Sequence, residues 1–311
     1  MTDKKKSEQV LRSKRRFKSI IAICTAVLML SVSYIMEVSG MWDNIYQITQ
    51  IGSIYEESSS YPLSITVYDA GDANCVMVRF EEHYILIDSG MKKIQNNISN
   101  KLKSEDIERI DLAILSTPDE RYIGNMGYVA ECVPIDRFIT CDNGTAQMPE
   151  TYVELLTNLH EKNIPVEYVK SGDTIDFGEM NLSIVSPCKQ YDKFGDNSLA
   201  VRLSYGEFSM LFMGDASKKA QTDMIKSGEE LGCDVLLAAS QGRRNSVTNE
   251  YLRATHPKDV IISTCQTDYI PDNVVLAQII EYSDKVYLTD ISGNIIIESD
   301  GISYKIITQF E

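Results

Sequence analysis

From residue 61 onward, short runs of apolar and β-branched residues alternate with polar loops and with longer amphipathic stretches. Residues 63–68 alternate apolar and polar positions and predict a β-strand, and residues 75–80 and 84–88 predict the next two strands. Residues 93–108 predict an amphipathic helix. Strands and helices that alternate in this way are typical of a layered α/β protein.

The same alternation continues through the second half of the chain, without any repeat of sequence. Further strands are predicted over residues 137–140, 166–169, 174–177, 180–185, 199–203, 208–213, 235–239, 260–263, 285–289, 294–299 and 302–307. Helices are predicted over residues 151–162, 218–232 and 273–282.

One stretch, residues 111–127, joins a buried strand to an unusually polar loop. The strand is predicted over residues 110–115, and a helix is predicted to begin near Ile123. Polar loops at the C-terminal ends of buried strands carry the chemistry of many α/β proteins. This loop is therefore the first candidate for a functional site.

The chain before residue 61 differs in composition. Residues 1–18 carry eight lysines and arginines against two acidic residues, a net charge of +6, and are expected to form a basic cytoplasmic tail. Residues 19–36 carry no charge, and as a helix they would extend about 27 Å, close to the thickness of a bilayer core. We therefore expect a single transmembrane helix over residues 19–36, a polar linker over 37–60 and one folded domain over 61–311.

The basic flank lies on the N-terminal side of this apolar segment. The positive-inside rule then places the N-terminus in the cytoplasm and the large domain outside. The expected localisation is a single-pass protein of the cell membrane with an extracytoplasmic C-terminal domain. The alternative is a cleaved signal peptide, with its apolar part at residues 20–30 and small residues at Ser31 and Ser33.

Charge and cysteine content narrow the classes of partner. The whole chain has a net charge of −15, so the residues after 18 carry −21 and would repel a phosphate backbone, which makes nucleic acid an unlikely partner. The seven cysteines contain no C-x-x-C pair; Cys24 lies in the apolar N-terminal segment, and we interpret the other six as small buried side chains. Disulfides remain open for a domain outside the cytoplasm.

Six short motifs follow one another along the chain, each at a predicted strand end. They are Asp69-x-Gly-Asp72, Ile87-Asp-Ser-Gly90, Leu115-x-x-Pro-Asp119 with Ile123-Gly124, Asp196-Asn-Ser-Leu199, Phe212-Met-Gly-Asp215 and Thr289-Asp-x-x-Gly293. In this order they resemble the metallo-β-lactamase fold and, more narrowly, the ComEC-type extracytoplasmic domain of competence proteins. The resemblance covers about residues 63–300. It implies a four-layer α/β/β/α sandwich with its site along one edge.

In that family the site holds zinc or manganese, and the enzymes hydrolyse phosphodiester or other ester and amide bonds. The family's loop after the fourth predicted strand carries His-x-(His or Asp)-x-Asp-His. At those positions this chain has Thr117, Asp119, Arg121 and Tyr122. This loop of the chain therefore has one of the family's carboxylate ligands and none of its histidines.

The later ligands show the same loss. The family's histidines before a glycine and before a proline correspond to Ser240, Gln241 and Ile270, whereas its Gly-Asp ligand is retained as Asp215. The chain's histidines fall on none of the motif positions; they are His83, His160 and His256. A hydrolytic zinc site needs three or more protein ligands, usually rich in histidine.

If any metal binds, Asp119, Asp215 and Asp88 are its candidate ligands. The arginines at 121, 243 and 244 place positive charge where a cation would bind. We therefore predict that a guanidinium takes the place of the metal and pairs with Asp119, Asp215 or Asp88. The alternative is that these arginines are solvated surface charge.

The leading functional hypothesis is a membrane-anchored domain without cofactor or hydrolytic activity. It would act as a binding module for an anionic ligand or an envelope protein partner, or as a structural subunit. The alternative is a metal-dependent phosphodiesterase or nuclease that uses manganese, magnesium or zinc in a carboxylate site. We interpret the acidic loop at residues 69–72 as a structural turn in preference to a catalytic pair of carboxylates. The candidate groove residues are Asp69, Asp72, Asp88, Thr117, Asp119, Arg121, Tyr122, Asp215, Ser240, Gln241, Arg243 and Arg244.

Overall fold

The computed structural model describes residues 61–94, 107–144, 148–265 and 271–310, together with Ser31, Ile98 and Leu102. The chain divides into two compact units, residues 1–58 and 59–311. Apart from Ser31, the predicted tail, transmembrane helix and linker lie outside the described residues. No helix in the described residues has the length and apolar character that a membrane crossing requires.

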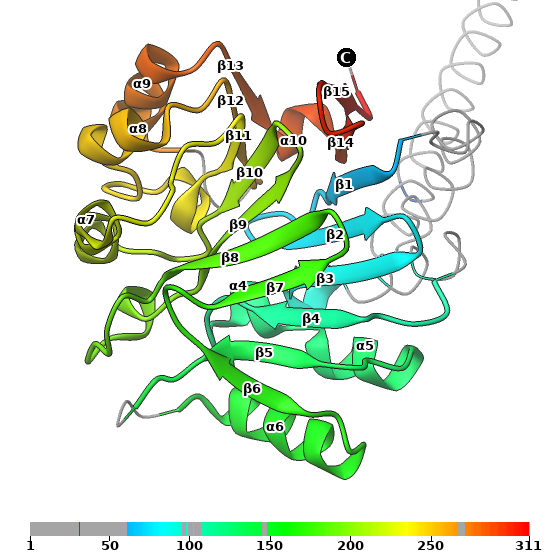
Figure 1. The fold of residues 1–311 in the computed structure, drawn as a ribbon. Helices are drawn as coiled ribbons and strands as arrows, with labels where there is room; N and C mark the ends of the chain where they lie inside the picture. Colours follow the sequence, from blue (N-terminus) through cyan, green and yellow to red (C-terminus); the bar gives the residue numbers. More distant parts are fainter. Residues whose placement is uncertain are drawn as a thin grey trace, which may run out of the picture. The chain divides into compact units, whose positions relative to one another are not determined.

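Two β-sheets pack face to face in the second unit (Figure 1). In the described residues, one sheet has eight strands in the order β15-β14-β1-β2-β3-β4-β5-β6, and the other has seven in the order β13-β12-β11-β10-β9-β8-β7. The strands are β1 Leu63–Val67, β2 Cys75–Phe80, β3 His83–Ser89, β4 Leu112–Leu115, β5 Phe138–Cys141, β6 Val166–Val169, β7 Thr174–Phe177, β8 Met180–Ser186, β9 Ala200–Tyr205, β10 Phe208–Phe212, β11 Val235–Leu237, β12 Asp259–Ile262, β13 Lys285–Leu288, β14 Ile295–Ser299 and β15 Tyr304–Thr308.

Each sheet joins an antiparallel part to a parallel part. Strands β3 to β6 are parallel in the first sheet, and β10 to β13 are parallel in the second. Strands β4 and β11 are short runs in which every side chain is buried. A parallel strand covered on both faces has this continuous apolar pattern.

Helices cover the outer face of each sheet (Figure 1). The helices are α4 Glu120–Ile123, α5 Met126–Cys132, α6 Glu150–Glu161, α7 Lys218–Ser227, α8 Asn249–Thr255, α9 Asn273–Tyr282 and α10 Thr289–Ser292. One apolar core lies between the sheets and contains residues such as Ile65 and Val201. A second core packs α4, α5 and α6 on the first sheet, and a third packs α7, α8 and α9 on the second. The predicted two-sheet α/β sandwich is therefore confirmed.

Several predicted helix limits are wrong. The helix expected to begin near Ile123 begins at Glu120, because the Asp119 side chain accepts a hydrogen bond from the Arg121 backbone N–H and caps the first turn. The helix predicted over residues 218–232 ends at Ser227, since Gly228 takes a left-handed conformation with φ of 83°. Helix α8 was not predicted.

The helix predicted over residues 93–108 lies largely outside the described residues. Its described start, Lys92–Ile94, is a 3₁₀ turn, and residues 107–109 are not helical. Ile98 and Leu102 are helical and buried in the second core.

Gly124 allows α4 to approach the segment that follows β3. A Cβ atom at this position would lie 2.5 Å from the Lys92 backbone N and 2.6 Å from the Gly90 carbonyl O. These neighbours are backbone atoms, which cannot turn away as a side chain can. The close approach therefore requires glycine immediately after the candidate loop.

We predict that Gly124→Ala lowers the free energy of unfolding by about 2 kcal/mol, because backbone must shift to admit the methyl group. Gly127→Ala is the matched control, since a Cβ at Gly127 would meet nothing within 4 Å. On α5 that change should be neutral or should stabilise by up to about 1 kcal/mol. Urea unfolding of the full chain measures both. Equal shifts for the two variants would contradict the predicted backbone clash.

Candidate functional site

The C-terminal ends of two strands in each sheet meet at one edge of the sandwich (Figure 1). The loop after β4 leads into α4, the loop after β10 contains Gly214, and the loop after β11 forms a 3₁₀ turn, η3 Ala239–Gly242. The Ser240 N–H donates to the Gly214 carbonyl at 3.0 Å, and the Leu199 N–H donates to the Ser116 carbonyl at 2.8 Å. These bonds hold the strand-end loops of both sheets together.

Arg121 joins these loops through its guanidinium group. Nε donates to Asp119 Oδ1 at 2.7 Å, Nη1 donates to Gln241 Oε1 at 2.9 Å, and Nη2 lies 3.6 Å from Asp215 Oδ2. The Arg121 side chain is only 16% exposed. Burial disfavours its charge, but the Asp119 hydrogen bond and the nearby negative charges raise the pKa of Arg121 overall. The predicted pairing of Arg121 with Asp119 and Asp215 is therefore present, and the interpretation of Arg121 as solvated surface charge is wrong.

Gln241 connects the arginine to a buried tyrosine. Its Nε2 donates to the Tyr122 hydroxyl at 3.0 Å and lies 3.5 Å from Asn74 Oδ1. Ser240 and Gln241 both have left-handed backbone conformations, with φ of 49° and 54°. Such a conformation is unfavourable for residues with side chains, and it persists where the surroundings determine it. The turn directs the amide of Gln241 to both Arg121 and Tyr122.

Asp215 receives contacts from both sides of the site. Its Oδ1 accepts hydrogen bonds from the hydroxyls of Ser240 and Tyr122, and its backbone N–H donates to Ser198 Oγ at 2.8 Å. Burial raises the pKa of Asp215, while the Ser240 hydrogen bond and the Arg121 charge act in the opposite direction. The pKa of Asp119 is lowered, because its hydrogen bonds from Arg121 together outweigh the effect of burial.

Asp88 lies behind the network and is 1% exposed. It occupies a left-handed position with φ of 57°, at a shift in register between β2 and β3. Its two oxygens accept hydrogen bonds of 2.8 Å from the backbone N–H and the hydroxyl of Ser116. Burial raises the pKa of Asp88 to about 8, despite these bonds. Its carboxyl is therefore largely neutral at pH 7 and serves to hold the loop after β4.

Arg243 forms an ion pair with the fully buried Asp72, not with the carboxylates predicted for it. The prediction missed this pairing because Asp72 was interpreted as part of a turn. The loop that contains Asp72 is also tied to the site, since the Asn74 N–H donates to the Arg121 carbonyl at 3.2 Å. Arg121 and Arg243 thus contact different acidic residues on adjoining loops.

Three predicted groove residues lie apart from the network. Arg244 is exposed and lines a separate pocket. Asp69 is exposed, its backbone N–H donates to Asn294 Oδ1 at 2.9 Å, and its own Oδ1 accepts a hydrogen bond from the Gly71 N–H at 3.3 Å. Thr117 is fully buried, and its hydroxyl has no hydrogen-bond partner among the residues that the structure describes. The structure thus supports Asp69 as a turn residue.

Arg121 occupies oxygens at the candidate metal-ligand positions. The oxygens of Asp119, Gln241 and Asp215 face the Arg121 guanidinium. No group of three or more His, Cys, Asp or Glu side chains with metal-binding geometry occurs within the described part of the chain. Ile270 lies outside the described residues.

The histidines lie elsewhere in the fold. His83 Nδ1 is 3.2 Å from Asp111 Oδ1, His160 is exposed on α6, and His256 is exposed at the end of α8.

Ser116, Ser198 and Asn74 contribute to the site and were not among the predicted residues. Ser198 lies in the Asp196-Asn-Ser-Leu199 motif and Ser116 directly follows β4, so their positions at strand ends could have indicated them. Asn74 has no comparable signal, because its role depends on a contact with Gln241, which is far away in the sequence.

The two sheets, their outer helices and the site at the strand ends define a metallo-β-lactamase fold. The metallo-β-lactamase fold protein YhfI from Bacillus subtilis superposes with a TM-score of 0.51 at 11% identity, over 76% of this chain and 100% of that chain. An identity this low supports the shared fold alone. Comparison with protein-family models finds no match.

The chain is also similar in sequence to competence proteins. It is 24% identical over 197 residues to ComE operon protein 3 of Bacillus subtilis (strain 168), covering 62% of this chain and 25% of that protein. It is 26% identical over 236 residues to competence protein ComA of Neisseria gonorrhoeae, covering 74% of this chain and 31% of that protein. The chain therefore spans about a quarter to a third of the length of the curated relatives it matches. It is a relative of ComEC-type competence proteins and has the metallo-β-lactamase fold, as its motifs predict.

The raised pKa of Asp88 predicts a specific dependence of stability on pH. The folded carboxyl keeps its proton up to about pH 8, whereas the unfolded one loses it near 3.8. The contribution of Asp88 to the free energy of unfolding therefore falls as pH rises through this window. Asp88→Asn cannot ionise, so its stability relative to the wild type should increase between about pH 5 and about pH 8.

Urea unfolding of the full chain at several pH values measures this difference. Glu167→Gln is the control, because hydrogen bonds from Arg137 lower the pKa of Glu167 and leave it ionised throughout the window. A difference between Asp88→Asn and the wild type that stays constant with pH would show that Asp88 is ionised in the folded domain.

Proposed function

We propose that this domain retains a metallo-β-lactamase fold without metal chemistry and acts as a binding or scaffolding module. The observation that carries the proposal is the Arg121 guanidinium, held among Asp119, Gln241 and Asp215. In the family these positions, or their neighbours in the same loops, ligate metal. Here a cation that belongs to the chain joins the same loops.

Electrostatics support this proposal. A divalent cation beside a buried guanidinium would meet strong repulsion, and the oxygens it needs already accept hydrogen bonds. Asp88 offers little compensation, because its carboxyl is buried, bonded to Ser116 and largely neutral at pH 7. Metal binding would require Arg121 to give up its contacts with Asp119, Gln241 and Asp215.

Two groups of the network, Tyr122 and Asp119, are poorly suited to activate water. Burial and the charge of Asp215 raise the pKa of Tyr122 well above its ordinary value, so its hydroxyl stays protonated and unsuited as a base. Asp119 has a lowered pKa and is bonded to Arg121, which makes it a weak proton acceptor. Both features fit a structural network better than a hydrolytic one.

The same contacts indicate which kind of module the groove forms. The donors of Arg121 point to Asp119 and Gln241, and Arg243 pairs with Asp72. A ligand in the groove would have to break these pairs, which costs binding free energy. The groove therefore favours a scaffolding role, and a ligand is better accommodated at another surface of the domain.

We place this module outside the cytoplasm, anchored by the apolar segment over residues 19–36. The +6 charge of residues 1–18 supports this orientation. An envelope protein is the kind of partner that such a scaffold would serve.

A metal-dependent phosphodiesterase is the second candidate. It is favoured by the partial exposure of Asp119 and Asp215, at 41% and 21%, because both could reach a metal if Arg121 turned away. This candidate predicts stoichiometric metal and metal-dependent turnover.

Metal analysis combined with an activity assay separates the two candidates. The full chain, purified without chelator, should contain substoichiometric zinc, manganese and magnesium. It should show no hydrolysis of bis(p-nitrophenyl) phosphate or DNA above that of Asp215→Ala when each metal is added. Glu167→Ala, which removes a surface carboxylate, is the matched control. Stoichiometric metal with turnover that is lost in Asp215→Ala and kept in Glu167→Ala would overturn the proposal.

A further inference from the structure

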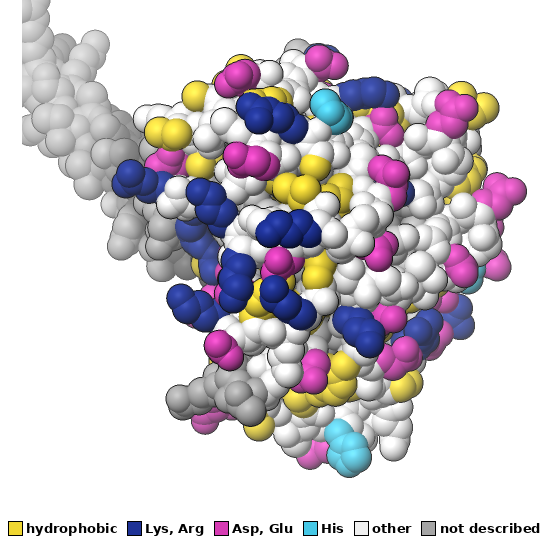
Figure 2. All heavy atoms as spheres, turned by 60° about the vertical axis from the view of Figure 1, so that its left-hand side comes forward, with side chains coloured by type: hydrophobic (Ala, Val, Ile, Leu, Met, Phe, Trp, Pro, Cys, Tyr) yellow, Lys and Arg dark blue, Asp and Glu magenta, His cyan; other side chains and the backbone are white. Residues whose placement is uncertain are grey.

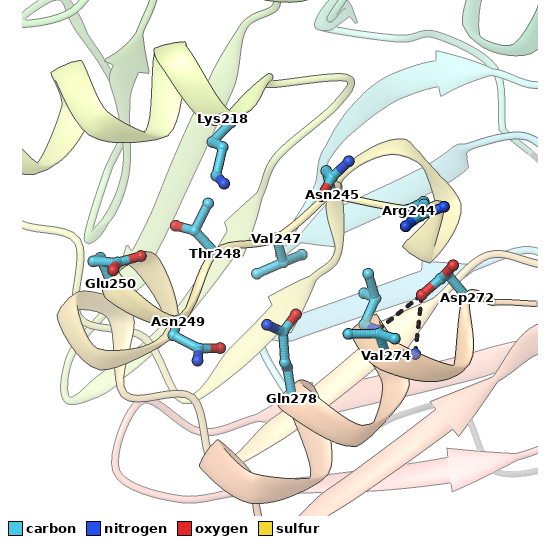
Figure 3. Close-up of a pocket in the computed structure, with 11 residues that line it drawn as sticks. Lys218, Arg244, Asn245, Val247, Thr248, Asn249, Glu250, Asp272, Val274 and Gln278 are labelled. Atoms are coloured by element: carbon cyan, nitrogen blue, oxygen red, sulfur yellow. Dashed lines mark hydrogen bonds between the residues drawn. The ribbon is translucent and has the colours of Figure 1, made fainter.

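A pocket of about 340 Å³ lies between the start of α7, residues 244–250 and the first turns of α9 (Figure 3). This volume is in the range of small-molecule sites. The pocket adjoins the network along the chain, because Arg244 follows Arg243 and Lys218 lies three residues after Asp215. Its lining does not include the residues that bind Arg121.

Lys218 and Arg244 provide positive charge on different sides of this pocket (Figure 3). Within the described part of the chain neither side chain forms an ion pair, in contrast to Arg121 with Asp119 and Arg243 with Asp72. Both side chains are exposed. Figure 2 shows lysine and arginine side chains gathered on this side of the domain, although residues 19–311 carry a net charge of −21.

Two acidic residues also line the pocket, and their surroundings differ. Asp272 Oδ1 accepts hydrogen bonds from the backbone N–H groups of Val274 and Val275, at 2.9 and 3.3 Å, so it caps α9 (Figure 3). Glu250 lies in the first turn of α8. The lining therefore carries two cations and two carboxylates, and one of the carboxylates caps α9.

The rest of the lining suits the neutral part of a small polar molecule. Asn245, Asn249 and Gln278 offer amide donors and acceptors, and Val247 provides apolar surface. Asn249 Oδ1 is buried and makes no hydrogen bond within the described residues.

From this arrangement we propose that the pocket binds a small phosphorylated organic molecule. Arg244 pairs with the phosphate, because a guanidinium matches its charged oxygens, and Lys218 adds favourable charge from the other side of the pocket. The organic part lies against the amide side chains and Val247. This inference supplies a ligand for the binding module proposed above, at a site separate from the Arg121 network.

Isothermal titration of the full chain tests the proposal with defined probes. These are inorganic phosphate, adenosine 5′-monophosphate and glucose 6-phosphate, with adenosine and glucose as the unphosphorylated parents. At least one phosphorylated molecule should bind more tightly than both its parent and inorganic phosphate. The double variant Lys218→Gln/Arg244→Gln should weaken that binding about tenfold or more.

Lys226→Gln/Arg253→Gln is the matched control. It removes the same charge from exposed positions on α7 and α8 outside the pocket, and it should leave affinity within about twofold of the wild type. Phosphorylated probes that bind no better than their parents would overturn the proposal, and so would equal weakening by both double variants. Neither outcome would affect the metal analysis, so a failure of this inference is distinguishable from a failure of the proposed scaffold.

Discussion

Oxygen atoms from three loops converge on the guanidinium of Arg121. Asp119 belongs to the loop before α4, Asp215 follows β10, and Gln241 lies in the turn after β11. The guanidinium therefore connects a loop of the first sheet to two loops of the second. Much of the surrounding geometry serves this contact. The left-handed turn at Ser240 and Gln241 presents the amide, Asp119 caps α4, and Gly124 lets that helix pack closely behind β3.

A buried charge is unfavourable unless its partners compensate for its loss of hydration. Arg121 meets this condition with planar, directional donors that match carboxylate and amide oxygens. In the family that the motifs resemble, a metal ion joins the same loops through histidines, which the motif positions of this chain do not carry. The fold can therefore keep its strand-end loops in place without the chemistry that the family resemblance implies. Any ligand-binding role then has to use another surface, and the pocket beside α7 and α9 has cations that are not paired within the described residues.

The sequence predicted the fold well because each buried strand has a strong local pattern. The apolar runs of β4 and β11 and the alternation of β1 are visible without tertiary information. Helix α8 was missed because it is a seven-residue helix between two loops, where local propensity is weak. The start of α4 was misplaced because a capping aspartate looked like a loop residue.

The site was predicted in part. The loss of histidine at several motif positions, together with the gain of Arg121, led to the correct expectation of an ion pair with retained carboxylates. The partner of Arg243 could not be found in this way, since Asp72 is 171 residues distant in the sequence and was assigned to a turn. Arg244 is predicted to lie in the same site as Arg243, but it lines a separate pocket. Adjacent side chains on an irregular segment can face different surfaces. Contacts of this kind depend on tertiary packing, which local patterns do not report.

A double-mutant cycle tests most directly whether the Arg121 guanidinium holds the loops together. The cycle compares the free energy of unfolding of the wild type, Arg121→Ala, Asp215→Ala and the double variant. The two residues lie on loops of different sheets, with Nη2 and Oδ2 3.6 Å apart. Our account predicts a favourable coupling of about 1 kcal/mol or more between them. Effects that add to within about 0.3 kcal/mol would contradict it, because they would show that the arginine and the aspartate stabilise the fold independently.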